Sequence, residues 1–197
     1  MPVKAPYRLR EAETSDAPAI LEIYDHYVKN TVISFELETP PLTEFENRIR
    51  TIKENHPYIL AERDGLIIGY AYAARHQSRA AYQWNAELSV YIHQNHTGQG
   101  LGPALYNTLI DLAGAMNLRN VYGCVATPNP ASEKLHARLG FVTEGVFRRT
   151  GFKFGQWHDV TWFGKRLAEY PDPPAQPLSI QRLPARLVGD ILDARSI

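Results

Sequence analysis

Cysteine is almost absent from the sequence. The one cysteine, Cys124, excludes a disulfide within the chain, and a lone thiol cannot build a thiolate metal site. The seven histidines include no pair in the spacing H-x-x-x-H, so we expect no bound metal. A chain without internal disulfides suits a reducing compartment, and we expect a cytoplasmic protein.

Long apolar runs and an excess of one charge are absent as well. No stretch approaches the ~18 apolar residues that a membrane span requires, and Met1 to Arg10 contain no apolar core of a signal peptide. Acidic and basic residues balance at 21 each. This balance gives no electrostatic reason to expect nucleic acid or an anionic membrane as a partner.

The length and composition predict one globular domain followed by a tail. The chain has 197 residues, of which 44% are hydrophobic, enough for a core without disulfides or metals. Residues 171–177 hold four prolines, so we place the end of the domain near Tyr170 and a Pro-rich linker and tail at 171–197. The tail carries apolar residues that could serve an interface, and 186–195 could form a short helix.

Hydrophobic periodicity predicts the helices. Apolar residues at helical spacing mark 17–29, a long helix from Leu101 to Met116, and a short helix at 130–139 that ends at Gly140. Thr43 and Glu46 form a capping-box pattern that opens a helix reaching about Asn55. Pro18 suits a first helical turn.

Alternating and apolar stretches predict seven strands. Asp64-Gly65 is typical of the turn of a hairpin between the second and third strands. The resulting order, β-α-α-β-β-β-α-β-α-β-β, predicts the α/β (α+β) class, with a mixed central sheet and helices on both faces. The strands are expected at 7–10, 58–63, 66–75, 86–93, 121–126, 147–154 and 158–167.

A glycine-rich stretch, Thr97-Gly98-Gln99-Gly100-Leu101-Gly102, joins a strand to the long helix. Backbone N–H groups at such a turn, together with the helix dipole, make a site for an anion such as a pyrophosphate. The spacing G-x-G-x-G differs from both the P-loop and the dinucleotide fingerprint. Taken alone, it is also compatible with a flexible turn.

Two motifs together resemble a known family. The glycine stretch resembles the pyrophosphate loop of the GNAT acetyltransferases, [Q/R]-x-x-G-x-[G/A], although Thr97 stands where Gln or Arg is usual. Residues 129–141 resemble the family's second signature, N-x-x-[AS]-x-x-L-[HY]-x-x-x-G-[FY]. Residues 31–35, 80–92 and 151–160 resemble the branch that acetylates phosphinothricin and methionine sulfone or sulfoximine. The likeness runs from about residue 7 to 170.

The resemblance implies a GNAT fold and an N-acetyltransferase. It implies transfer of the acetyl group of acetyl-CoA to the α-amino group of a small amino-acid-like substrate, directly in a ternary complex, as in herbicide or antibiotic detoxification. It also implies a homodimer. Two alternatives stay open: acetylation of a protein N-terminus or lysine, and a non-catalytic module that binds acetyl-CoA.

Glu87 and His136 are the candidate catalytic residues. Glu87 lies mid-strand among apolar neighbours, and a desolvated carboxylate has a raised pKa that suits proton removal from an amine near neutral pH. The resemblance places the catalytic Glu at this point, whereas the alternative is a Glu on a solvated strand face. His136 stands where many relatives have a Tyr acid, and the alternative is a histidine on a helix surface.

The resemblance also implies the binding residues. It implies that the strand of Glu87 separates from the one at 121–126 and that the pantetheine arm lies between them. From the sequence itself, we expect Cys124 to be a buried strand residue without a catalytic role. Gln77 replaces a Lys of the phosphinothricin branch, which favours neutral-side-chain substrates. The arm would contact Ser89, Val90, Tyr91 and Asn129, the pyrophosphate would contact Thr97, Gly98, Gln99, Gly100, Leu101 and Gly102, and the acceptor would contact Phe35, Arg79, Tyr82 and Ser89.

Overall fold

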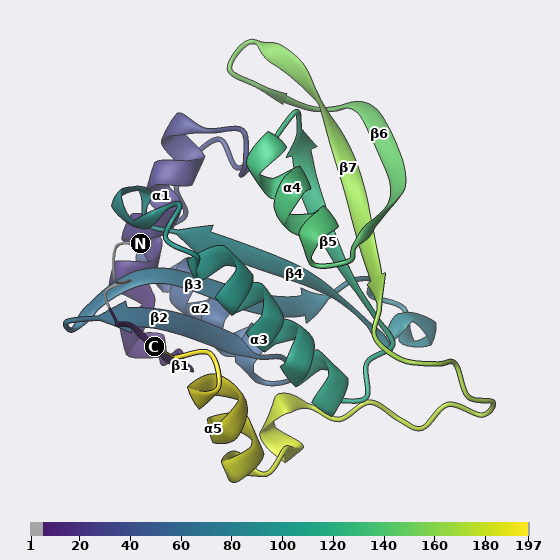
Figure 1. The fold of residues 1–197 in the computed structure, drawn as a ribbon. Coiled ribbons are helices and arrows are strands. Elements are labelled where there is room, and N and C mark those ends of the chain that lie inside the picture. The colour runs from purple at the N-terminus through teal and green to yellow at the C-terminus, as the bar shows by residue number, and fades with distance from the viewer. Residues whose placement is uncertain (1–5, 197) are drawn as a thin grey trace.

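The protein is built on one seven-stranded mixed sheet. A computed structural model describes residues 6–196; Met1–Ala5 of the N-terminal segment and Ile197 lie outside the described residues. The strand order is β1-β2-β3-β4-β5-β7-β6, in which only the β4–β5 pair is parallel. This arrangement confirms the predicted fold class (Figure 1). The strands are β1 (Arg8–Glu11), β2 (Tyr58–Arg63), β3 (Leu66–Arg75), β4 (Asn85–Ile92), β5 (Asn120–Thr127), β6 (Val142–Lys153) and β7 (Gln156–Arg166).

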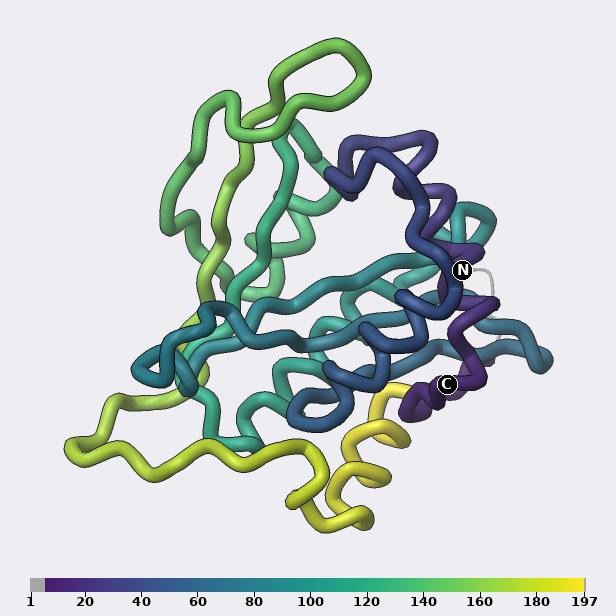
Figure 2. Tube along the Cα trace, turned by 180° about the vertical axis from the view of Figure 1, so that it is seen from behind, coloured from purple at the N-terminus to yellow at the C-terminus, as the bar shows by residue number. Residues whose placement is uncertain are grey.

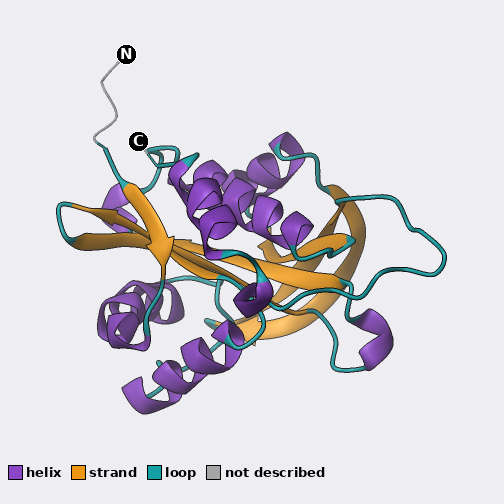
Figure 3. Cartoon of the chain, turned by 90° about the horizontal axis from the view of Figure 1, so that it is seen from below, coloured by secondary structure: helices purple, strands orange, loops and turns teal. Residues whose placement is uncertain are grey.

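Helices cover both faces of the sheet (Figure 3). One face packs on α1 and α2, and the other packs on α3, α4 and α5. Alternate residues of β2 therefore enter different cores, with Leu60 on the α1 side and Ile59 on the α3 side. The helices are α1 (Ala17–Asn30), α2 (Leu42–Lys53), α3 (Leu101–Ala115), α4 (Pro130–Arg138) and α5 (Ala185–Asp193). Among residues 6–196, no helix combines the length and apolarity needed to cross a bilayer.

Two local predictions are wrong. The capping box at Thr43 and Glu46 does not form, because α2 begins at Leu42 with Pro41 as its N-cap residue. The strand expected from residue 147 begins at Val142 instead, since β6 pairs with β7 through two register irregularities that interrupt its alternation. In contrast, the turn at Asp64-Gly65 has positive φ at both residues, as the hairpin prediction requires.

The segment after β7 returns to the sheet and joins its core. Seen from behind, it runs beneath the sheet and ends beside β1 (Figure 2). Trp84 donates its indole N–H to the Ala175 carbonyl at 2.8 Å, and α5 packs on α3 and β1. The apolar tail residues therefore lie largely in the chain's own core, and those that are buried are Ile180, Leu183, Val188 and Leu192.

The opposite edge of the sheet exposes large apolar side chains. β6 is the edge strand, and it has β7 as its only neighbour within the described sheet. The rings of Phe152 and Trp157 contact each other at 5.2 Å on the surface of this hairpin. The exposed apolar residues of the hairpin, here called the β6–β7 face, are Val142, Val146, Phe147, Phe152, Phe154 and Trp157.

Candidate active site

β4 and β5 separate beyond Glu87. Within the described chain, the two strands pair only between Asn85–Glu87 and Asn120–Tyr122. β4 continues to Ile92 and β5 to Thr127, and the two diverge like the arms of a V (Figure 1). The facing strand edges therefore leave backbone groups available to an extended ligand, which could pair like an added strand. A cavity of about 70 Å³ lies between them, lined by Ile33, Leu88, Ser89, Val90, Tyr91, Tyr106, Cys124, Val125, Ala126, Asn129 and Ser132.

The glycine loop ends at the start of α3, near the open end of this gap. Gly98 and Gly100 have φ of 72° and 86°, a conformation that L side chains rarely adopt. Gly102 is buried, and a Cβ there would lie 3.3 Å from Leu135 and 3.6 Å from Ile92. The first backbone N–H groups of α3 and the helix dipole make this end of the helix a site for an anion.

The loop has a basic neighbour that the sequence analysis did not identify. Arg63, at the end of β2, donates from Nη1 to the Gln99 Oε1 at 2.8 Å. His96 also lies nearby, and burial, followed by the charges of His93 and Arg63, lowers its pKa. Thr97 donates its hydroxyl to the Gln94 carbonyl, so this side chain stabilises the loop itself. No local signal marks Arg63, because it precedes Gln99 by 36 residues.

Glu87 lies at the vertex of the V. It is half-buried and stands opposite Ala74 of β3 and Tyr122 of β5. Burial raises the pKa of its carboxyl above the usual range, because a low-dielectric environment disfavours the charged form. Ser89, two residues further along β4, forms a hydrogen bond with Tyr72. Burial raises the pKa of Tyr72 to about 12. The geometry thus places a carboxyl with enhanced basicity where the gap begins.

His136 is buried completely rather than lying on a helix surface. Its Nδ1 lies 2.8 Å from the Ser132 carbonyl, which can only accept, so Nδ1 carries the hydrogen. Burial lowers the pKa of the ring and keeps it neutral, and Nε2 therefore accepts the hydroxyl of Tyr106 at 3.0 Å. A Cβ on Gly123 would come within 2.3 Å of Nε2. His136 thus lies against β5 and orients Tyr106, which lines the gap.

Cys124 is not buried as expected; it is exposed and lines the gap. Gly123 and Val125 point to the α3 and α4 face of the sheet, so the alternation turns Cys124 to the opposite face, where it lines the cavity between β4 and β5. Desolvation and the Glu87 carboxylate raise the pKa of the thiol to about 12. A thiol that stays protonated is a poor nucleophile.

Asn129 also reaches the gap, from the start of α4. Its side-chain oxygen accepts the N–H of Ser132 at 3.1 Å, which makes it the N-cap of the helix. Its own N–H donates to Glu133 at 2.7 Å. The side chain is therefore held in one orientation at the wall of the gap.

Of the four expected acceptor residues, Ser89 lines the gap, and the structure does not place the other three in one cavity. Phe35 packs on Gly151, where a Cβ would lie 2.3 Å from the ring. Arg79 and Tyr82 lie in the connection between β3 and β4, and both are exposed. Phe35 therefore belongs to the β6–β7 side of the molecule and the other two to the β3–β4 side.

A cavity of about 290 Å³, here called the aromatic cavity, adjoins the vertex. His76 stacks on Tyr122 at 4.4 Å and meets the edge of Trp162 at 5.3 Å. Tyr122 pairs with Glu87, so both side chains point to the same face of the sheet. Within the described residues, His76 Nδ1 and Trp162 Nε1 are buried without a hydrogen-bond partner. The remaining lining comes from Gln77, Glu144, Gly145 and Phe147.

These parts fit one kind of chemistry. A basic carboxyl stands at the narrow end of a gap that can hold an extended chain, and an anion site stands at the wide end. An aromatic cavity, whose lining includes the Tyr122 that pairs with Glu87, offers space for a second reactant. The arrangement suits group transfer from a long anionic donor to a small acceptor whose reacting atom must lose a proton.

Comparisons with known proteins agree with this geometry. The model of the Acetyltransferase (GNAT) domain matches residues 9–162. The phosphinothricin N-acetyltransferase of Alcaligenes faecalis is 42% identical over 154 residues, covering 77% of this chain and 78% of that protein. An L-methionine sulfoximine/L-methionine sulfone acetyltransferase of Salmonella typhimurium is 32% identical, covering 85% and 98%. The structure of a Sinorhizobium meliloti phosphinothricin acetyltransferase in complex with AcCoA superposes with a TM-score of 0.82 at 34% identity, covering 87% and 93%.

Proposed function

This chain belongs to the GNAT family of N-acetyltransferases, and we propose that it acetylates the α-amino group of a small amino acid with a neutral side chain. The observation that carries the proposal is the position of Glu87, a carboxyl of raised pKa at the point where β4 and β5 separate. Acetyl-CoA supplies the acetyl group as a reactive thioester. The chain's own residues bind it, orient the amine and remove a proton.

The residues present fit acetyl-CoA. The pantetheine arm would lie in the gap against Ser89, Val90, Tyr91 and Asn129, all of which line the cavity there. The pyrophosphate would lie on the loop from Thr97 to Gly102, with backbone N–H groups as donors and Arg63 nearby. This assignment extends the expected phosphate contacts by one basic side chain.

Glu87 would act as the general base. An amino acid carries an ammonium near neutral pH, which has no lone pair, so Glu87 takes one proton directly or through a water. The freed amine then forms the C–N bond as the C–S bond breaks, and the thiolate leaves with the electron pair. The second proton that the nitrogen loses passes to the thiolate, so the products are the amide and the free thiol. The developing oxyanion would be stabilised by a backbone N–H of β4 on the edge that faces the gap.

The aromatic cavity favours a neutral acceptor side chain. Its walls are the rings of His76, Tyr122, Phe147 and Trp162, and Glu144 would repel an anion. His76 Nδ1 and Trp162 Nε1 can bond an uncharged oxygen such as that of a sulfone. Arg79, on the neighbouring connection, would pair with the substrate carboxylate, and Tyr82 and Phe35 would close the site from two sides.

The first prediction concerns Glu87. Replacing it with Gln removes the base, and we expect kcat to fall about 100-fold or more. For the native chain, kcat/KM should fall as the pH drops through a pKa above the ordinary glutamate value, since protonation removes the base. Thiol release from acetyl-CoA measures both. The control is Glu22→Gln on the exposed face of α1, and equal rates for the two variants would contradict the role.

The second prediction concerns His136, which we propose positions Tyr106 instead of exchanging a proton with the reactants. His136→Asn should lower kcat about tenfold, and Tyr106→Phe should lower it similarly, because both break one hydrogen bond. Neither variant should move the acidic limb of the pH profile, which belongs to Glu87. A shifted limb in His136→Asn alone would instead show that His136 titrates in the reaction.

The third prediction concerns Gln77. Restoring a cation with Gln77→Lys should raise kcat/KM for phosphinothricin relative to methionine sulfone by about tenfold, since a charge pair with the phosphinate is gained. The control is Ser78→Lys, which adds the same charge at the next exposed position. A panel with methionine sulfoximine, common L-amino acids and a short peptide ranks the substrates. Turnover of the peptide alone would replace the proposal with protein acetylation.

The fourth prediction concerns assembly. We propose that a second copy covers the β6–β7 face in a homodimer, because this hairpin at the edge of the sheet exposes six large apolar side chains. Trp157→Asp should convert dimer to monomer in sedimentation velocity. Leu66→Asp, equally exposed at the distant β2–β3 turn, should leave the dimer intact. A native chain that sediments as a monomer at micromolar concentration would refute the interface.

A further inference from the structure

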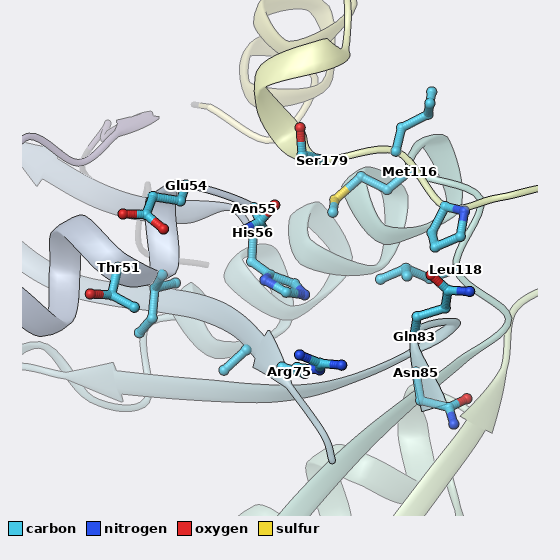
Figure 4. Close-up of a pocket in the computed structure, with 14 residues that line it drawn as sticks. Thr51, Glu54, Asn55, His56, Arg75, Gln83, Asn85, Met116, Leu118 and Ser179 are labelled. Atoms are coloured by element: carbon cyan, nitrogen blue, oxygen red, sulfur yellow. The ribbon is translucent and has the colours of Figure 1, made fainter. Parts of the chain in front are cut away.

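A larger cavity lies at the other end of β4, away from the gap. It occupies about 470 Å³ where the ends of α2 and α3 meet residues 177–179, and we call it the tail cavity (Figure 4). None of its lining residues belongs to the gap or to the aromatic cavity. The proposed acetyl transfer therefore leaves it without a role.

The tail supplies one wall of this cavity and is held in place by backbone hydrogen bonds. The N–H of Leu178 donates to the Met116 carbonyl at 2.9 Å, and that of Ile180 donates to the Asn55 carbonyl at 3.0 Å. Gln181 adds a bond to the Lys53 carbonyl at 3.0 Å. The family model matches the chain only to residue 162, so this wall comes from a segment beyond the match.

The tail cavity has one cationic side chain in its lining, the exposed Arg75, together with the imidazole of His56. Figure 4 shows the His56 imidazole, from the turn between α2 and β2, and the Arg75 guanidinium, from the end of β3, directed into it. Burial and then the charge of Arg75 lower the pKa of His56, which is consistent with the two groups lying close together. Within the described residues, Arg75 has no ion-pair partner. The acidic lining residue, Glu54, turns its carboxylate away from both in Figure 4.

Polar and apolar groups share the rest of the lining. The oxygen of Asn85 accepts from Asn120 at 2.8 Å, which leaves its NH₂ group for a ligand, and Gln83 also lines the cavity. Ile52, Met116 and Leu118 form an apolar floor. A guanidinium pairs well with a carboxylate, and an apolar floor accommodates a hydrocarbon body.

We propose that the tail cavity binds a small organic carboxylate, with its carboxylate on Arg75 and its apolar body against Met116 and Leu118. The ligand would also contact Asn85, two residues before Glu87 on the same strand. This is a second site, distinct from the acetyl-transfer site, and it stands independently of which amine is acetylated.

The test uses the full chain and a probe that has no amine to acetylate. 4-Methylpentanoate is added to isotope-labelled protein, and NMR follows the backbone amides of Leu178 and Ser179 and the ring of His56. We expect saturable shifts at these three residues. 4-Methylpentanamide, which has the same shape without the charge, should bind at least about tenfold more weakly. Equal binding of the two probes, or no saturable shift with the carboxylate, overturns the proposal.

Variants locate the site. Arg75→Gln should weaken binding of 4-methylpentanoate by about tenfold or more, because it removes the charge-assisted pair. Arg8→Gln on the edge strand β1 is the matched control and should bind like the native chain. Both changes are at exposed positions, and thermal melting confirms that each variant is folded. Unchanged binding in Arg75→Gln, or shifts confined to Ser89 and Asn129 in the gap, refutes the assignment.

Discussion

The active site takes its shape from the separation of β4 and β5 beyond Glu87. Two adjacent parallel strands lose most of their mutual backbone hydrogen bonds, which is costly unless each strand is held elsewhere. Here β4 pairs with β3 from Ala86 to Ile92, and β5 pairs with β7 along its whole length. Each strand is therefore fixed by one complete ladder. The gap between them can persist, and its exposed strand edges remain free for an extended ligand.

Glycines allow the helices to approach both walls of the gap closely. Gly123 has no side chain where the His136 ring packs, so α4 lies tightly against β5. In this position His136 accepts the hydrogen bond of the Tyr106 hydroxyl and orients that side chain. Gly102 does the same for α3, against Ile92 of β4 and Leu135 of α4. The two contacts set the width of the gap from opposite sides. The rings that stack around His136 then keep it neutral and in place.

The tail contacts both the core on the α3 face and the connection between β3 and β4. It contributes four buried residues to the core on the α3 face. It also accepts hydrogen bonds from Trp84 and from Asn117 at the Ala175 carbonyl. Trp84 ends the β3–β4 connection that bears Arg79 and Tyr82, so the tail restrains the segment expected to face the acceptor. Loss of the tail would therefore affect the stability of the core and the order of this connection together.

Neighbouring residues predict most of the elements, their order and the local parts of the site. Periodicity and turn chemistry depend only on residues close together in the chain. The helices, the hairpin at Asp64-Gly65 and the glycine loop before α3 could therefore be predicted from the amino-acid sequence. The two signatures led to the family, which the comparisons confirm.

Tertiary structure alone decided how distant segments meet. Pairing with β7 set the true start of β6, and the divergence of β4 left Cys124 exposed beside the gap. Arg63 beside Gln99, the rings of the aromatic cavity and the charged tail cavity each join residues tens of positions apart. Side-chain periodicity says which residues share a face, whereas strand register and the return of the chain decide what that face contacts.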